Sequence, residues 1–342
     1  MTDSKIASAT LDSPSTAIGG YYELELPPSL SLPYPCAKLF QSARAAFVAL
    51  LKVIHPSRVW MPRYICNAML APLERLRIEC GWYDLNDGLA VANPPRLKAG
   101  EYLLYVNYFG VCSVQTAELM DVIHPEQLLL DHSQAFFDPP ANCLATLYSP
   151  RKFFGVPDGG LLVSHLDIPQ PETIDDDSIN RMSHLISRLA SGPEAGYAAY
   201  QAEEDTLRDM EPKTMSWLTR RILSSIDFAA LRKRRRENFS FLHEAFKLDN
   251  MLSFNASDVI SPLCYPLLQR EPSPYLRQWL IQNKVFVPQY WPDCLPRANA
   301  VEKSMSLACL PLPCDHRYGP NELNKVIGLV ADYRTGTTNH YA

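Results

Sequence analysis

Short apolar segments alternate with helical patterns through the first half of the chain, and this alternation constrains the fold more than any other feature. Apolar residues at helical spacing predict helices over residues 42–54, 66–80 and 116–123. Short apolar runs predict strands over residues 58–61, 82–84, 102–107, 127–131, 145–148 and 160–164. This order predicts an α/β fold, with a mostly parallel sheet of the seven-stranded type between layers of helices.

The length of 342 residues is enough for one large domain and a smaller one. We expect a polar leader over residues 1–20, a large domain over residues 21–225 and a small α/β C-terminal domain over residues 226–342. Residues 21–26 alternate apolar and acidic side chains, which predicts a short strand. Residues 165–215 are acidic and polar without a strand pattern, so we expect a helical insert there.

Composition narrows the class of protein. A net charge of -5 gives no reason to expect nucleic-acid binding, and no apolar stretch approaches the roughly 20 residues that span a bilayer. The nine cysteines include no C-x-x-C pair, which indicates reduced thiols in a cytoplasmic protein and no metal site. The basic run at residues 232–236 predicts a solvated helix face, with a nuclear-import or nucleic-acid patch as the alternative.

One lysine lies in a turn between two predicted strands. Lys152 follows Ser149 by three residues and precedes the glycine pair Gly159-Gly160. This spacing suits pyridoxal phosphate (PLP), because the serine hydroxyl can bind the cofactor phosphate while the lysine amine forms a Schiff base with the aldehyde. The S-x-x-K spacing also occurs in serine acyl hydrolases, where it begins a helix, whereas Pro150 favours a loop here.

An acidic residue ends the strand before this turn. Asp131 follows three leucines, and a buried carboxylate needs a partner such as a protonated pyridine nitrogen. The alternative role for Asp131 is a helix N-cap. Gln134 is a candidate donor to the phenolic oxygen of the cofactor, or a plain surface glutamine. Asn107, Asp131 and Ser149 each end a predicted strand, and the carboxyl ends of parallel strands share one crevice.

Other candidate ligands lie in the first long helix and in two loops. Ser42, Ala43 and Arg44 begin the helix, where backbone N–H groups bind phosphate and an arginine adds a charge-assisted contact. The alternative is an ordinary cap with an exposed arginine. Tyr64 is a candidate to stack on the pyridine ring, or a core aromatic. Asn107 is a candidate contact to the ring or the substrate, or a turn asparagine.

These motifs together resemble the DegT/StrS-type PLP-dependent sugar aminotransferases, within the aspartate-aminotransferase-like superfamily of fold type I. The resemblance covers about residues 20–335, in the order of the family. It lies in the helix start at residues 42–44, the loop at 62–66, the strand and turn at 106–110, the family's DxAQ at 131–135, the lysine turn at 152–160, and the segments 289–292 and 310–318.

The resemblance implies transamination from an amino acid, with glutamate as the expected donor, to a keto sugar linked to a nucleotide. It implies that Lys152 holds the cofactor and moves a proton, that Asp131 keeps the ring protonated, and that the protein is a homodimer of polysaccharide or antibiotic biosynthesis. The chain departs from the family at Leu147, where the family has its phosphate-binding serine, and Ser149 is the expected replacement. The family's asparagine-rich loop is not recognisable in residues 165–215.

Three other functions fit the same residues. The first is a PLP enzyme of this fold with another reaction or an amino-acid substrate. The second is a non-catalytic relative that binds a nucleotide sugar or a protein partner, although the joint presence of Lys152, Asp131 and Gln134 argues against it. The third is an S-x-x-K acyl hydrolase, in which an acylating probe would label Ser149 and PLP would not bind.

Overall fold

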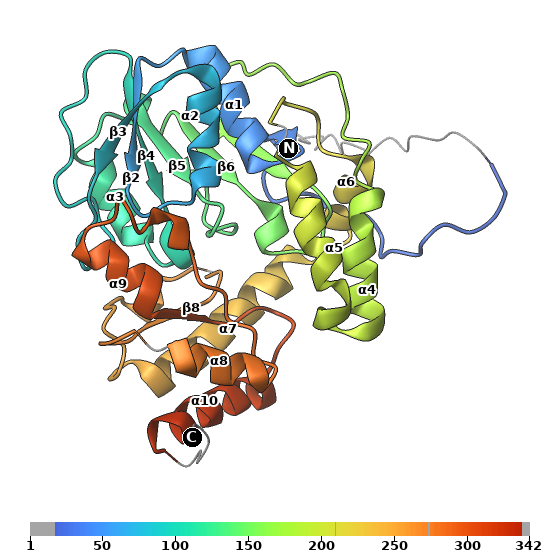
Figure 1. The fold of residues 1–342 in the computed structure, drawn as a ribbon. Helices are drawn as coiled ribbons and strands as arrows, with labels where there is room; N and C mark the ends of the chain where they lie inside the picture. Colours follow the sequence, from blue (N-terminus) through green and yellow to red (C-terminus); the bar gives the residue numbers. More distant parts are fainter. Residues whose placement is uncertain (1–17, 209, 261, 273, 337–342) are drawn as a thin grey trace, which may run out of the picture.

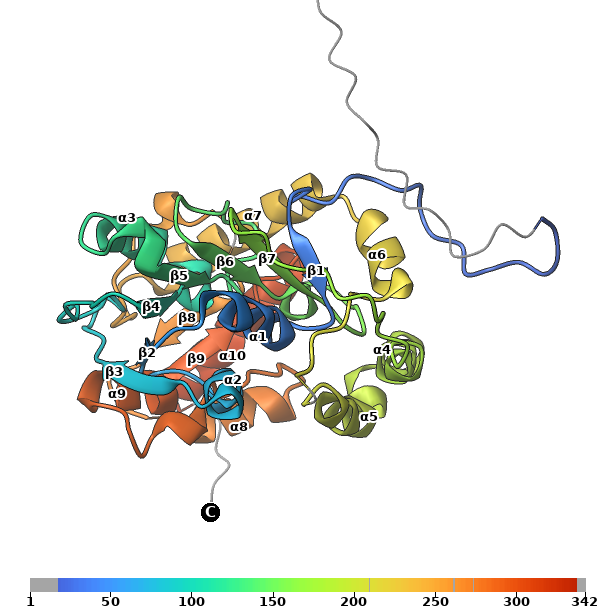
Figure 2. The same ribbon diagram turned by 90° about the horizontal axis from the view of Figure 1, so that it is seen from above.

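The computed structural model describes residues 18–336 except 209, 261 and 273. The predicted leader therefore lies outside the described residues apart from residues 18–20. Residues 21–25 are exposed, Leu26 is half-buried, and none of them forms a strand, so the strand predicted there is wrong. The alternating pattern fails because these residues lie in an arm that extends away from the body, where no neighbouring strand can pair with them (Figure 2).

The core of the molecule is one seven-stranded sheet, which confirms the predicted α/β fold class. Its strand order is β1-β7-β6-β5-β4-β2-β3, and β2 to β6 are parallel to one another, while β7 runs antiparallel to both of its neighbours. The strands are β1 (Lys38–Phe40), β2 (Arg58–Pro62), β3 (Glu79–Tyr83), β4 (Glu101–Val106), β5 (Leu128–Asp131), β6 (Ala145–Tyr148) and β7 (Gly160–Ser164).

Helices cover both faces of this sheet. Figure 2 shows α1 (Ala43–Ile54) and α2 (Ala71–Leu76) on one side of it and α3 (Ser113–Met120) on the other. The helix predicted over residues 66–80 is too long at both ends. A 3-10 turn precedes α2, and Arg77 takes a left-handed conformation with φ 56° that ends it, so Cys80 belongs to β3.

The rest of the chain is mainly helical. The residues predicted as an insert form a hairpin of α4 and α5 beside the sheet, and the C-terminal part forms a small antiparallel pair of strands with helices (Figure 1). The elements are α4 (Ser183–Ser191), α5 (Pro193–Thr206), α6 (Trp217–Ser224), α7 (Phe228–Phe246), β8 (Tyr265–Leu268), α8 (Pro274–Gln282), α9 (Ala300–Ala308), β9 (Cys309–Leu312) and α10 (Pro320–Arg334). Short 3-10 turns lie at Asn67–Met69, Tyr108–Gly110, Pro125–Gln127, Pro150–Lys152, Asn180–Met182, Ala256–Asp258 and Pro292–Cys294.

The C-terminal part lies against the carboxyl ends of the strands. Beyond β2, the Asn67 amide donates to Asp293 Oδ2 at 2.5 Å. Beyond β3, the Leu85 amide donates to Glu302 Oε1 at 3.0 Å. Beyond β4, the Phe109 carbonyl accepts a hydrogen bond from the Leu263 amide at 2.8 Å. The turns that carry the candidate site residues are therefore enclosed between the sheet and the C-terminal part.

The basic run at residues 232–236 is not uniformly solvated, so the prediction of a solvated face is wrong for one member. Arg235 is 2% exposed, whereas the other four side chains are exposed. Its position on α7 explains the difference, because Arg235 shares the buried stripe of the helix with Phe239, Leu242 and Phe246. One cation of the run thus points into the protein.

Two predictions from composition can be compared with the structure. All nine cysteines are among the described residues, and each is a free thiol. Across residues 18–336, apart from the three undescribed positions, no helix has both the length and the apolar character that crossing a bilayer requires.

Gly160 allows the lysine-bearing segment to approach the start of α1, and replacing it should be costly. A Cβ at this position would lie 2.2 Å from the Ser42 carbonyl carbon and 2.4 Å from the Ala43 nitrogen. Both are backbone atoms, so we expect Gly160→Ala to lower the free energy of unfolding by about 3 kcal/mol or more, measured by urea denaturation. Gly328→Ala is the control, because no atom within 4 Å crowds its Cβ and the helix should gain about 0.5–1 kcal/mol. Equal stability of the two variants would contradict the close approach.

Candidate active site

The lysine turn follows β6 directly. Ser149 precedes the 3-10 turn Pro150–Lys152, and its side chain caps no backbone group. The amides of Phe153 and Phe154 both donate to the Pro150 carbonyl at 2.9 Å. The two phenylalanine side chains are buried, whereas Lys152 is exposed. The buried phenylalanine side chains therefore anchor the turn in the protein, while the Lys152 side chain is exposed.

Three other segments pack against this turn. On α5, the carboxylate of Glu204 forms an ion pair with Arg151, the residue before the lysine. On α4, Leu185 lies over Gly155, where an added Cβ would be 3.6 Å from its Cδ2. On α7, Arg235 lies against Phe153. The predicted insert is thus part of the wall around the lysine turn.

Asp131 ends β5 at the same edge of the sheet. Its side chain is buried, with 4% exposure, and Oδ1 accepts a hydrogen bond from the Ser133 amide at 2.8 Å. No helix begins after Asp131, so the helix N-cap alternative is wrong. Its other oxygen, Oδ2, accepts no hydrogen bond from the described part of the chain. One carboxylate oxygen is therefore free for a ligand.

The Cys66 thiol lies in the loop after β2, and nearby charges affect its pKa. Burial raises the pKa of Cys66, the positive charge of Lys152 lowers it, and the negative charge of Asp131 raises it further. Both groups thus lie within electrostatic reach of one thiol. Lys152 follows β6, which pairs in parallel with β5, so Lys152 and Asp131 follow the carboxyl ends of two neighbouring strands.

Ser42, Ala43 and Arg44 lie at the start of α1, beside the glycine pair Gly159-Gly160 that follows the lysine turn. Ser42 Oγ accepts from the Ala45 amide at 3.1 Å, which is an ordinary N-cap. Arg44 is half-buried, and its guanidinium has no hydrogen-bond partner within the described ranges. Burial lowers the pKa of Arg44, and the charges of Glu204, Arg151 and Cys66 also act on it. The arginine is therefore not the freely exposed side chain of the alternative interpretation.

Gln134 is fully buried, which excludes a plain surface glutamine. Its Oε1 accepts from the Phe109 amide at 2.7 Å and so holds Phe109 in a left-handed conformation with φ 55°. Its Nε2 is buried and has no partner among the residues that the structure describes. A buried amide donor without an acceptor is uncommon, so Gln134 Nε2 is available to a ligand atom.

The polar atoms of Asn107 serve the turn in which it lies. Its Nδ2 donates to Asp138 Oδ2 at 2.8 Å, and its Oδ1 accepts from the Cys112 amide at 2.9 Å. Tyr64 is buried, with its ring 5.5 Å from that of Tyr108 and 4.9 Å from that of Trp291. These contacts are those of a turn asparagine and a core aromatic. Direct contact of either residue with a cofactor stays a prediction.

Sequence reasoning missed a buried acid near the site. Burial raises the pKa of Asp138 to about 6, and hydrogen bonds from Ser113 and Asn107 oppose the shift. The neighbouring His132 is also buried, which lowers its pKa to about 4, so its ring is neutral at pH 7. Asp131 consequently has no positive charge from His132 beside it.

Arg297 is a second residue that the sequence did not reveal. It comes from the C-terminal part and binds the loop after β2 through the carbonyls of Arg63 (3.0 Å) and Ile65 and through Asn67 Oδ1 (2.7 Å). Its guanidinium also lies 5.3 Å from the ring of Trp82. These contacts place Cys66 at the site. No local pattern could have shown them, since the two segments are far apart in the sequence.

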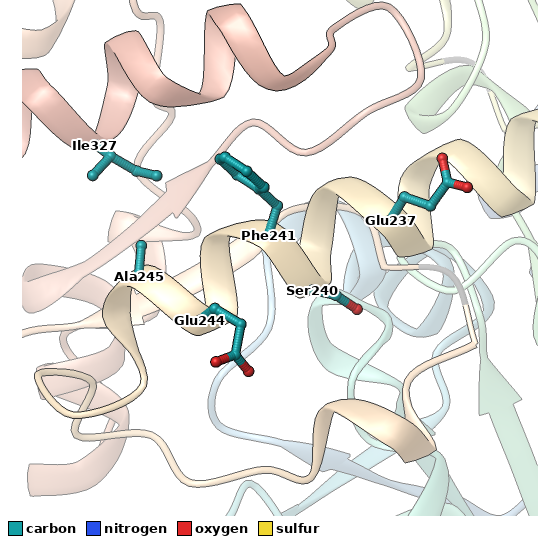
Figure 3. A pocket seen from close by; sticks show the side chains of 6 residues that line it. All are labelled: Glu237, Ser240, Phe241, Glu244, Ala245 and Ile327. Atoms are coloured by element: carbon teal, nitrogen blue, oxygen red, sulfur yellow. The ribbon is translucent and has the colours of Figure 1, made fainter.

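An open apolar groove lies elsewhere, between α7 and α10 (Figure 3). Figure 3 shows Phe241 and Ala245 of α7 facing Ile327 of α10, with two acids at the edge. These side chains lie on the solvent side of α7, away from the stripe that contains Arg235. The groove holds none of the predicted site residues.

The arrangement of the sheet and the C-terminal part is found in known proteins. No family model matches the sequence, and no curated protein matches it. Solved structures do match over most of their length, at low sequence identity, and several of them are sugar aminotransferases. The chain therefore has the fold of that class of enzyme.

Three of these structures illustrate the likeness. The sugar aminotransferase CalS13 from Micromonospora echinospora is 14% identical, with a TM-score of 0.57 over 86% of this chain and 87% of its own. Spr1654 from Streptococcus pneumoniae, in its PMP-form, is 13% identical, with a TM-score of 0.58 over 86% of both chains. DesI, solved in the presence of its TDP-sugar product, is 16% identical, with a TM-score of 0.57 over 86% of this chain and 79% of its own.

Proposed function

We propose that this protein is a PLP-dependent aminotransferase with Lys152 and Asp131 as its catalytic residues. One observation carries the proposal: a buried carboxylate ends β5, a lysine follows the neighbouring strand β6, and three other polar groups of the candidate site lack hydrogen-bond partners in the described chain. These groups are the buried Gln134 Nε2, the Arg44 guanidinium and the Ser149 hydroxyl. They fit the cofactor, because they match its phenolic oxygen and its phosphate.

Each residue has a definite task in this proposal. When bound, PLP supplies an aldehyde and an electron-withdrawing ring. The Lys152 amine would hold the aldehyde and, in its neutral form, would move a proton at the substrate carbon. The Asp131 carboxylate holds a proton on the ring nitrogen, and Gln134 Nε2 donates to the phenolic oxygen. Ser149, Arg44 and the first amides of α1 bind the phosphate.

The structural relatives support the cofactor and the class of substrate. Spr1654 was solved in both PLP- and PMP-forms, and DesI with a TDP-sugar. We propose that this chain takes an amino group from an amino acid, with glutamate as the donor, and transfers it to a nucleotide-linked keto sugar. A role in polysaccharide biosynthesis in the cytoplasm follows as part of the same proposal.

We also propose a homodimer. Large apolar side chains are exposed on the α4–α5 hairpin, where Leu189 is 90% exposed and Tyr197 is 59% exposed. The arm before β1 exposes Tyr21 and Tyr22 as well. A second copy of the chain would cover such surfaces, and sedimentation of the purified protein tests this. The domain limits of 21–225 and 226–342 likewise remain a proposal.

An absorbance spectrum of the purified protein with PLP tests the function. We expect a visible band from the lysine-bound cofactor, and we expect added glutamate to replace it with the near-ultraviolet band of the pyridoxamine form. Absence of any lysine-bound band would contradict the cofactor. A band that persists with glutamate but changes with another substrate would favour a different PLP reaction. Labelling of Ser149 by an acylating probe without PLP binding would favour the hydrolase.

A further inference from the structure

One buried arginine binds the residue next to the candidate catalytic lysine. Arg235 of α7 donates from Nη2 to the carbonyl of Phe153 at 3.3 Å. Its guanidinium carbon also lies 4.6 Å from the centre of the Phe153 ring. Since Phe153 follows Lys152 directly, Arg235 holds the lysine turn through both a backbone and a ring contact.

The other side of the same guanidinium reaches a second turn. Arg235 Nη1 donates to the carbonyls of Pro262 at 3.2 Å and Leu263 at 3.3 Å. The Leu263 amide donates to the Phe109 carbonyl at 2.8 Å, and the Phe109 amide donates to Gln134 Oε1 at 2.7 Å. One chain of hydrogen bonds therefore connects the lysine turn to the turn at residues 131–134, which carries Asp131 and Gln134.

Stability alone does not account for this arginine. Its charge is met by carbonyl oxygens, and no carboxylate among the described residues forms an ion pair with Arg235. The nearby Asp315 instead binds Arg317, at 2.7 and 2.9 Å. Burying a cation without an acid is unfavourable compared with an apolar side chain of the same length. A lysine could not reproduce the contacts, because only the planar guanidinium presents several donors in fixed directions.

We propose that Arg235 is a positioning residue, which fixes Lys152 relative to Asp131 and Gln134 at the carboxyl ends of β5 and β6. The inference rests on the proposed function for the meaning of this geometry. The contacts themselves can be tested in the protein without cofactor.

Hydrogen–deuterium exchange of the cofactor-free protein tests the positioning. In Arg235→Met we expect the amides of Phe153 and Phe154 to exchange about tenfold faster than in the wild type, because a charge-assisted contact to the turn is lost. The amides of β5 and β6 should keep their rates. Arg232→Met is the matched control, since it removes an exposed cation from the same helix, and it should change neither set. If Arg235→Met does not fold, Arg235→Lys replaces it, and the amides of Phe153 and Phe154 should again exchange faster than in the wild type.

Reaction with PLP gives the second measurement. We expect Arg235→Met to attach PLP at Lys152 about tenfold more slowly than Arg232→Met, as followed by borohydride reduction and peptide mapping. Unchanged exchange at Phe153 and Phe154 in the variant would overturn the inference even if the wild type binds PLP. Faster exchange with unchanged attachment would show a structural role only and would also overturn it. Failure of the wild type to attach PLP at Lys152 would instead overturn the proposed function, whatever the exchange shows.

Discussion

Lys152→Ala should remove the visible absorbance of the PLP-bound protein and lower the rate of transamination by about 10³-fold or more. The lysine amine is the group that attaches the aldehyde and carries the proton, and alanine can do neither. Stability should change little, because Lys152 is exposed and its side chain forms no ion pair among the described residues. Spectra with PLP and single-turnover rates with glutamate provide the measurement.

Lys303→Ala is the control for this prediction. Lys303 is also exposed, and it lies on α9, outside the candidate site. Its replacement should leave the absorbance and the rate unchanged. Retention of the lysine-bound band in Lys152→Ala would show that another amine attaches the cofactor. It would also show that the turn after β6 does not hold the cofactor.

The fold was predictable because its signals are local. The short runs at residues 145–148 and 160–164 coincide with β6 and β7, since a strand between two neighbours in a covered sheet is mostly apolar. The first helix was predicted for the same kind of reason, with Ser42 as its cap. The strand expected at residues 21–26 failed because pairing depends on a neighbour, which a local pattern does not specify.

The site was predictable only where the chain order itself determines the geometry. Parallel strands end at one edge, so Asp131 and Lys152 could be expected to meet. Contacts from distant segments could not be expected, and this is why Arg297 and Glu204 were missed. Arg235 is different. Its spacing to Phe239 and Leu242 follows the buried stripe of α7, so the helical period contained the information, but the run of five basic residues obscured it.

Asp131→Asn should separate the electronic role of the carboxylate from its structural role. The amide has nearly the same shape, and its oxygen can still accept from the Ser133 amide, so the turn after β5 should persist. PLP should still attach to Lys152. An amide carries no negative charge to hold a proton on the ring nitrogen, so the half-reaction with glutamate should slow by about 10²- to 10³-fold. Stopped-flow absorbance measures this rate directly.

Two comparisons make the result specific to the site. Asp121→Asn changes an exposed acid at the end of α3 and should leave the half-reaction at the wild-type rate. Melting curves of both variants distinguish loss of charge from loss of fold. A rate in Asp131→Asn within about a factor of two of the wild type would mean that the carboxylate does not act on the ring. The free oxygen of Asp131 would then have a partner other than the ring nitrogen of PLP, because a buried acid with one free oxygen still requires a partner.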